Sequence, residues 1–174
     1  MAKLDHICVS IETLSTQPDA AIVTLAAVKF SLTHVGVESF VVNINPISSK
    51  NAGLRISRDT LDWWRKQRPD DINMWQQSST DLNEALEKFT SFCGNTSDIN
   101  FWSIRSRFDF PILESSFRAT DMKNIFWNIR DLGTAYYLAG LNSVPENRHE
   151  KDRDPINDCL NSILWLRKAL GQII

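Results

Sequence analysis

Four acidic residues stand where the ends of different predicted elements can bring their side chains together. Glu12 lies at the end of the first predicted strand, and Asp109 opens a predicted helix. Asp154 precedes the last predicted helix, and Asp158 lies in its first turn. Carboxylates that converge from separate elements form the oxygen-rich sites that Mg²⁺ and Mn²⁺ prefer. The alternative for each residue is a helix cap or a solvated surface charge, and this alternative fits Asp154 best.

The N-terminal third of the chain has the pattern of three consecutive strands. Residues 4–12 alternate between apolar and polar side chains, which is the period of a strand. Two further β-rich runs, at 22–30 and 37–44, follow after polar turns. Three strands in succession favour an antiparallel meander, and Glu12 lies where the first of them ends.

The remainder alternates between helical and strand patterns. Apolar residues at helical spacing predict helices at 57–64, 79–92, 110–118, 133–138 and 154–171. Residues 99–102 are typical of a short buried strand, and 127–132 is ambiguous. Proline is tolerated in the first turn of a helix, so Pro111 and Pro155 mark two helix starts, whereas Gly171 can end the last helix. This order predicts an α/β fold, a mixed sheet flanked by helices.

Composition indicates one globular domain over residues 1–174. Hydrophobic residues make up 43% of the chain and charged residues 23%, and the net charge is −2. Proteins that grip long stretches of duplex are usually basic, so that mode of binding is disfavoured. The three cysteines lack metal-site spacing and are expected to be reduced and buried. The longest apolar run, 20–28, is too short to cross a bilayer, and we expect a cytoplasmic protein with no membrane partner.

Three segments resemble the motifs of the DEDD family of 3′-to-5′ exonucleases, which have a ribonuclease-H-like fold. The segment 10–14, SIETL, resembles the first motif, Asp-x-Glu-Thr. The segment 102–109, WSIRSRFD, is similar to the second motif, Trp-x-x-Gly-x-x-Phe-Asp. The segment 153–159, RDPINDC, is similar to the third, His-Asp-Pro-x-x-Asp-Cys. Two further segments, 60–67 and 130–134, resemble the branch that contains phage exonuclease A and exoribonuclease-like proteins.

The resemblance implies a chemistry for these residues. In the family, the acidic residues hold two divalent ions, which activate water and stabilise the leaving oxygen, and a histidine is the general base. The catalytic and metal-binding residues implied here are Glu12, Asp109 and Asp158. Contacts with nucleic acid are implied for a further set: Thr13, Leu14, Trp63, Trp64 and Phe108.

The chain departs from the family pattern at three positions. Ser10 stands where the bridging aspartate belongs, Arg153 where the histidine belongs, and Arg105 where the second motif has glycine. A neutral hydroxyl cannot replace a bridging carboxylate, and a guanidinium cannot accept a proton at neutral pH. We therefore expect at most one weakly bound Mg²⁺ or Mn²⁺ ion, and catalysis that is impaired or lost.

Several alternatives remain open at these positions. Arg153 either bridges the remaining carboxylates in place of a metal or points to solvent. His149 replaces the missing base if the loop before Arg153 folds back. Ser10 is either natural or an introduced change, and the second loss at Arg153 favours the natural origin. Trp63 and Trp64 are adjacent on a helix, so one ring either stacks on a terminal base or is simply half-exposed beside a buried neighbour.

Three functions follow from these observations. The first is an impaired exonuclease-like protein that binds the 3′ end of DNA or RNA, or a protein partner. The second is an active, metal-dependent 3′-to-5′ exonuclease on single strands. The third is a protein-interaction module without nucleic-acid contacts. The resemblance to a phage branch also implies a phage or prophage origin.

Overall fold

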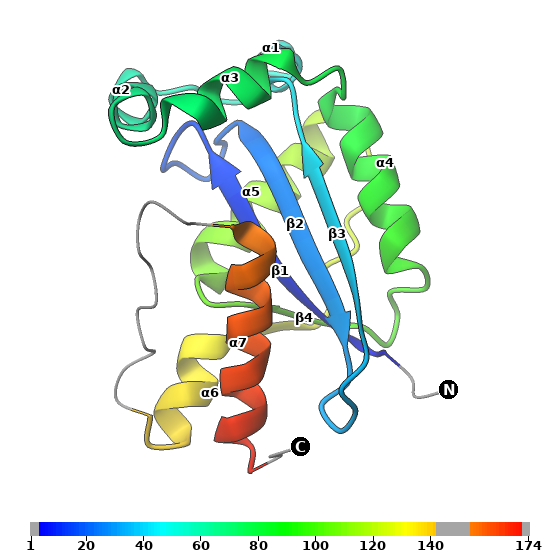
Figure 1. Ribbon diagram of the computed structural model, residues 1–174. Helices are drawn as coiled ribbons and strands as arrows, with labels where there is room; N and C mark the ends of the chain where they lie inside the picture. The colour runs from blue at the N-terminus through cyan, green and yellow to red at the C-terminus, as the bar shows by residue number, and fades with distance from the viewer. Residues whose placement is uncertain (1–3, 142–153, 172–174) are drawn as a thin grey trace.

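A five-stranded mixed sheet forms the centre of the computed structural model, which describes residues 4–141 and 154–171 (Figure 1). The strands are β1 (His6–Thr13), β2 (Ile22–Phe30), β3 (Val37–Asn43), β4 (Asn100–Ser103) and β5 (Ile129–Asp131), in the spatial order β3-β2-β1-β4-β5. β1, β2 and β3 pair antiparallel, whereas β4 is parallel to β1 and β5 is parallel to β4. The predicted N-terminal meander and the mixed α/β sheet are therefore confirmed.

Helices cover both faces of this sheet (Figure 1). The helices are α1 (Pro46–Asn51), α2 (Arg58–Gln67), α3 (Pro69–Gln77), α4 (Leu82–Cys93), α5 (Ser106–Ala119), α6 (Leu132–Leu138) and α7 (Pro155–Ala169). In Figure 1, α6 and α7 lie in front of the sheet, α4 and α5 lie behind it, and α2 and α3 cross one end. Among the described residues, no helix has both the length and the apolar character needed to cross a membrane.

Strand β1 separates two hydrophobic clusters because its side chains alternate between the faces. Ile7, Val9 and Ile11 pack into the larger cluster with residues from α2 to α5. Cys8 points to the other face and packs with Cys159 and neighbouring residues of α6 and α7. Ser10 and Glu12 share the parity of Cys8, so their side chains belong to the face that α7 covers.

The structure corrects several predicted boundaries. Helix α5 begins at Ser106, four residues before its predicted start at residue 110, so Pro111 lies inside the helix and not in its first turn. The ambiguous segment 127–132 contains the edge strand β5. Two helices, α1 and α3, were not predicted from the sequence. The last helix agrees well: Asp154 caps it through Ile156 N, Pro155 is its first residue, and Gly171 follows it with a φ of 68°.

Candidate functional site

The end of β1 carries the first group of site residues. The register against β2 shifts between Glu12 and Thr13: Glu12 is opposite Thr24, but Thr13 is opposite Ile22. An irregularity of this kind bends a strand and redirects its side chains, often beside an active site. Glu12 is only 6% exposed, and Ser10 is half-buried two residues earlier. The strand therefore presents Ser10 and Glu12 to the same space at its carboxyl end.

Asp109 is held by the turn between β4 and α5. Ser103, the last residue of β4, is fully buried, and its hydroxyl donates a hydrogen bond to Asp109 Oδ2. The backbone N–H of Arg105 donates to the same Ser103 Oγ at 3.0 Å, and Asp109 N–H donates to the Arg105 carbonyl at 2.9 Å. These bonds fix the backbone of Arg105 relative to the carboxylate of Asp109, which is 6% exposed.

Asp158, the third acidic residue that the motifs imply, belongs to α7. It lies in the first turn of that helix, where its N–H donates to the Asp154 carbonyl at 2.9 Å. The next residue, Cys159, is buried against β1 and donates its thiol to the Cys8 carbonyl at 3.5 Å. The pKa of Cys159 is raised above its ordinary value, first by its hydrogen bond with Cys8 and by burial, and further by the negative charges of Asp158 and Asp109.

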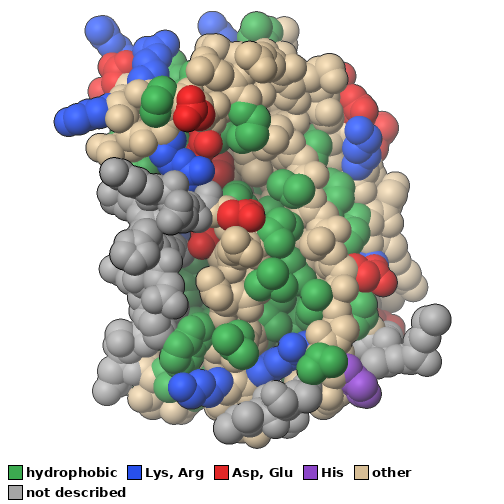
Figure 2. Space-filling view, viewed as in Figure 1, with side chains coloured by type: hydrophobic (Ala, Val, Ile, Leu, Met, Phe, Trp, Pro, Cys, Tyr) green, Lys and Arg blue, Asp and Glu red, His purple; other side chains and the backbone are tan. Residues whose placement is uncertain are grey.

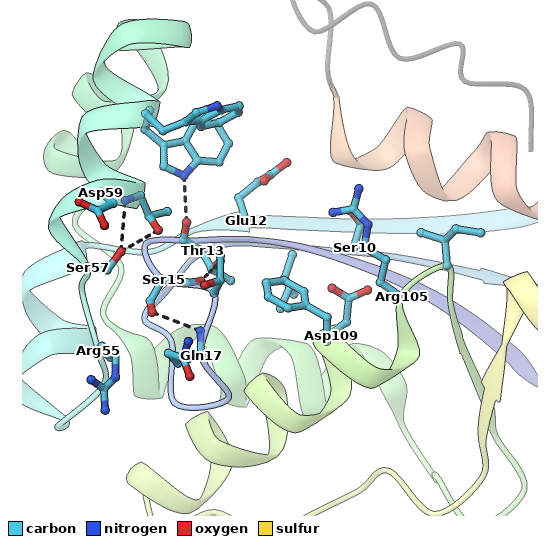
Figure 3. A pocket seen from close by; sticks show the side chains of 17 residues that line it. Ser10, Glu12, Thr13, Ser15, Gln17, Arg55, Ser57, Asp59, Arg105 and Asp109 are labelled. Carbon is cyan, nitrogen blue, oxygen red and sulfur yellow. Dashed lines mark hydrogen bonds between the residues drawn. The ribbon is translucent and has the colours of Figure 1, made fainter.

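A cleft of about 850 Å³ joins most of the predicted residues (Figure 3). Ser10, Glu12, Thr13 and Asp109 line it, together with Arg105. Figure 3 shows Ser10, Glu12, Arg105 and Asp109 along one part of the wall and α2 on the other side, next to Thr13. Asp158 does not line this cleft, although Pro155, also in the first turn of α7, lines a smaller pocket of about 260 Å³ that Glu12 also borders. Arg153 and His149 lie outside the described residues.

The two adjacent tryptophans of α2 have different environments. Trp64 is 3% exposed, and its indole N–H donates to the Thr13 carbonyl at 2.9 Å, which ties α2 to the end of β1. Trp63 is 43% exposed, lines the cleft, and meets Trp64 edge-on with ring centroids 4.9 Å apart. The buried ring is therefore structural, whereas the exposed ring offers a surface on which a base can stack.

Two other residues expected to contact nucleic acid also differ in exposure: Phe108 lines the cleft, whereas Leu14 is buried in the core. Phe108 is half-buried and lines the cleft. Leu14 is 2% exposed and packs in the larger hydrophobic cluster, so its side chain contributes to the core and not to the cleft wall. The sequence pattern gave no sign of Leu14's burial, because the chain turns directly after β1 and the alternation of the strand ends there.

Sequence reasoning missed a wall of hydroxyl and amide side chains. Ser15, Thr16, Gln17, Ser57 and Thr60 all line the cleft near α2 and the loop after β1. Several of them stabilise local turns: Ser57 caps α2 by accepting from Thr60 N–H at 3.1 Å, and Ser15 Oγ accepts from Gln17 N–H at 3.2 Å. Only the cap at Ser57 was predictable, since the others belong to a turn whose position depends on the fold.

The donor set of the described residues does not fit the pair of divalent ions that the DEDD motifs imply. Across residues 4–141 and 154–171, no three Asp, Glu, His or Cys side chains are grouped so as to hold a metal ion. Beside Glu12 and Asp109, the cleft has a neutral hydroxyl at Ser10. A bridging position needs a carboxylate that two cations can share, and serine does not supply one.

The strand order and the helix-covered mixed sheet define a ribonuclease-H-like fold. Residues 5–170 match a family described as the 3′-5′ exoribonuclease Rv2179c-like domain. The chain belongs to this family.

Solved structures support the fold. The RNase domain of the yeast Pop2 protein is similar with a TM-score of 0.68 and 13% sequence identity, over 98% of this chain and 78% of that one. Cell-death related nuclease 4 (CRN-4) is similar with a TM-score of 0.59 and 11% identity, over 95% of this chain and 63% of that one. Identities this low bear on the fold alone. Comparison with curated proteins gave no match.

Proposed function

We propose that this protein binds the 3′ end of an RNA strand in the cleft at the end of β1, and that its hydrolytic activity is strongly reduced. The observation that carries the proposal is the combination of a retained cleft with an altered donor set. Glu12 and Asp109 line the cleft, and Ser10, which also lines it, stands at the motif position where the family has a carboxylate. The family description supports RNA as the polymer.

The cleft has the features that recognition of a single strand requires. Trp63 provides an exposed aromatic face, and base stacking on such a face is tolerant of sequence. The hydroxyl groups of Thr16, Ser57 and Thr60 offer donors and acceptors for sugar and phosphate oxygens. The overall charge of −2 favours contact with a short terminal segment over long electrostatic tracking of a backbone. On the face that Figure 2 displays, Lys and Arg side chains lie in separate places, several of them beside Asp and Glu, and form no continuous basic stripe.

Two altered motif positions account for the reduced hydrolysis. Ser10 cannot bridge two cations, and Arg153, at the place of the general base in the motif, cannot accept a proton. General-base catalysis alone contributes about 10²- to 10⁴-fold in rate. The residues that remain can bind and orient a strand end, since those tasks need neither a bridging ligand nor a base.

The activity test is degradation of a 5′-labelled single-stranded RNA in Mg²⁺ or Mn²⁺, with time points resolved by electrophoresis. We expect no appreciable shortening by the unaltered protein. Ser10→Asp combined with Arg153→His should restore 3′-to-5′ shortening, with a gain larger than the two single changes predict, because residues that act as a unit are not additive. Glu12→Gln in the double variant is the control for contaminating nuclease.

One result separates this proposal from the second candidate, an active exonuclease. That candidate is favoured by the family assignment and by the retained Glu12 and Asp109. Processive shortening by the unaltered protein that disappears in Glu12→Gln establishes activity and contradicts the proposed impairment.

Binding is tested separately by fluorescence anisotropy with the same RNA. Trp63→Ala should weaken binding by about fivefold to a hundredfold, the range expected for loss of one stacked base. Trp127→Ala, at an exposed tryptophan (63%) outside the cleft lining, is the matched control and should bind like the unaltered protein.

A further inference from the structure

The carboxylates at one end of the cleft, its acidic end, repel any phosphate that enters it. Glu12 and Asp109 border this end, and both are buried carboxylates with 6% exposure. A phosphodiester beside two carboxylates is repelled unless a cation lies between them, and the attraction or repulsion grows as water is excluded. In an exonuclease of this fold the cations are metal ions, but the donor set here does not fit a pair of them.

Two guanidinium groups in the described part of the chain line the cleft, at Arg55 and Arg105. Arg55 forms a two-bonded pair with Asp19, with Nε to Oδ1 at 2.9 Å and Nη2 to Oδ2 at 3.0 Å. The pair raises the pKa of Arg55 and lowers the pKa of Asp19, first through the hydrogen bonds between them. The charge of Arg55 is therefore largely matched at the α2 end of the cleft.

Arg105 lies at the opposite, acidic end. Figure 3 shows its side chain on the part of the wall that carries Ser10, Glu12 and Asp109. Its backbone is fixed by the hydrogen-bonded link through Ser103 Oγ to the carboxylate of Asp109. With φ at −129°, the residue lies outside the left-handed region, so a side chain is accepted at a motif position that is otherwise glycine. The chain thus carries a guanidinium side chain, on a fixed backbone, on the part of the wall where the motif carboxylate is replaced by Ser10.

We propose that Arg105 binds a backbone phosphate of the strand end in this cleft, so that the protein holds RNA without a divalent ion. This inference rests on the proposed function and adds which group of the cleft neutralises the phosphate of the bound strand. A planar guanidinium offers parallel N–H donors that match two phosphate oxygens, which suits it to this contact. Metal-free binding then distinguishes this protein from an exonuclease that depends on its ions to neutralise the substrate.

The experiment measures anisotropy of a 5′-labelled single-stranded RNA in EDTA and in Mg²⁺, over a series of salt concentrations. The unaltered protein should bind equally well in both. Arg105→Gln should weaken binding in EDTA by about tenfold or more, as loss of a charged hydrogen bond predicts. The slope of log affinity against log salt should fall by about 0.7, the value for one phosphate contact on a single strand.

Two further variants control for charge and folding. Arg107→Gln removes the same charge from an exposed neighbour that does not line the cleft, and should leave both affinity and slope unchanged. Arg105→Lys keeps the charge and should retain most of the metal-free binding. A thermal melt of Arg105→Gln that matches the unaltered protein assigns the loss to the contact.

Three outcomes overturn the inference. The first is binding that requires Mg²⁺, and the second is an Arg105→Gln variant with unchanged affinity and slope. In both cases the proposed RNA-binding function survives, because binding itself is observed. The third is an absence of binding in EDTA and in Mg²⁺ alike, which overturns the proposed function together with this inference.

Discussion

At the scale of single residues, the replacement at Ser10 has the clearest consequence. Ser10 lies on the central strand and lines the cleft with Glu12 and Asp109. A carboxylate here would add a third hard oxygen donor to the two already present, and affinity for a divalent ion depends on the number of charged ligands.

We therefore predict that Ser10→Asp increases affinity for Mn²⁺ by about one order of magnitude or more. Isothermal calorimetry with Mn²⁺ on the purified variant measures the change. Ser57→Asp is the matched control: it adds a carboxylate to the same cleft, near α2, while keeping a good N-cap residue for that helix. Equal gains in both variants would mean that metal binding reflects the overall charge of the cleft and not a site at Ser10.

Ser10, Glu12 and Asp109 could be singled out from the sequence because the spacing of the motifs assigns each a position, and all three line the cleft. The sequence did not predict a role for Arg105, because it showed only that arginine replaces the glycine of the second motif. The placement of Arg105 became clear from the Ser103 link to Asp109, a contact between the end of a strand and the first turn of a helix. Contacts of this kind depend on tertiary geometry and leave no period in the sequence.

At the scale of elements, the side chain of Asp131, the last residue of β5, links that strand to α5 and α6. Its Oδ1 accepts from Thr134 N–H at 2.7 Å and caps α6, while its Oδ2 accepts from the hydroxyl of Ser106, the first residue of α5, at 2.7 Å. Gly133 follows closely, and a Cβ on it would approach Asp131 Oδ1 to 3.2 Å. The segment 130–134, which resembled an exonuclease segment in sequence, thus has a structural role.

The hydrogen bonds of Asp131 give a pH-dependent prediction. Burial by itself raises the pKa of this carboxyl, but the bonds from Ser106 and Thr134 outweigh it, and the pKa lies below its ordinary value. A carboxylate whose pKa is lowered by folding stabilises the protein above the ordinary value of about 3.9, and loses this contribution as the pH falls through the lowered value.

Asp131→Ala should accordingly cost about 1 kcal/mol of unfolding free energy at neutral pH, as for loss of an N-cap. The difference from the unaltered protein should shrink as the pH falls below about 4. Urea unfolding at several pH values measures it. Asp131→Asn, which keeps a cap acceptor without the charge, should lose less, and a pH-independent difference for Asp131→Ala would contradict the electrostatic part of the argument.

Elements with strong periodicity or clear caps were predictable from the sequence, and the others were not. The cap at Asp154, the proline at 155 and the glycine at 171 bounded α7 correctly. Helix α1 has six residues and only one buried side chain, Ser49, so it has no apolar stripe to detect. Helix α5 was predicted to start too late because Pro111 suggested a first turn, although the helix accommodates the proline in its interior.

At the scale of the whole molecule, the cysteines report on global unfolding. Cys8, Cys93 and Cys159 are free and buried, in agreement with the reduced thiols expected from their spacing. Burial raises the pKa of Cys93 to about 12, with a smaller opposing effect from Lys29. A thiolate is the reactive form, so both access and ionisation oppose reaction in the native state.

We predict that the native protein reacts slowly with an aromatic disulfide reagent, and that all three thiols react at once after unfolding in guanidinium. Absorbance of the released thiolate follows the reaction, and its rate in native buffer should track the global unfolding equilibrium. Rapid labelling of one thiol in native buffer would show that one side of the sheet opens locally. Cys159 is the informative position, since it packs between α7 and β1 beneath the site.

The central position of β1 has a consequence for how such a protein evolves. β1 is paired with β2 on one side and β4 on the other, and its side chains enter both hydrophobic clusters. The interactions that shape the cleft are therefore the same ones that keep the chain folded. Selection for a stable fold preserves the cavity even in a lineage where hydrolysis is no longer selected, so substitutions accumulate at its polar lining while its outline persists. In a chain of this architecture, replacing one side chain of the cleft therefore changes what the cleft can bind without removing the cleft itself.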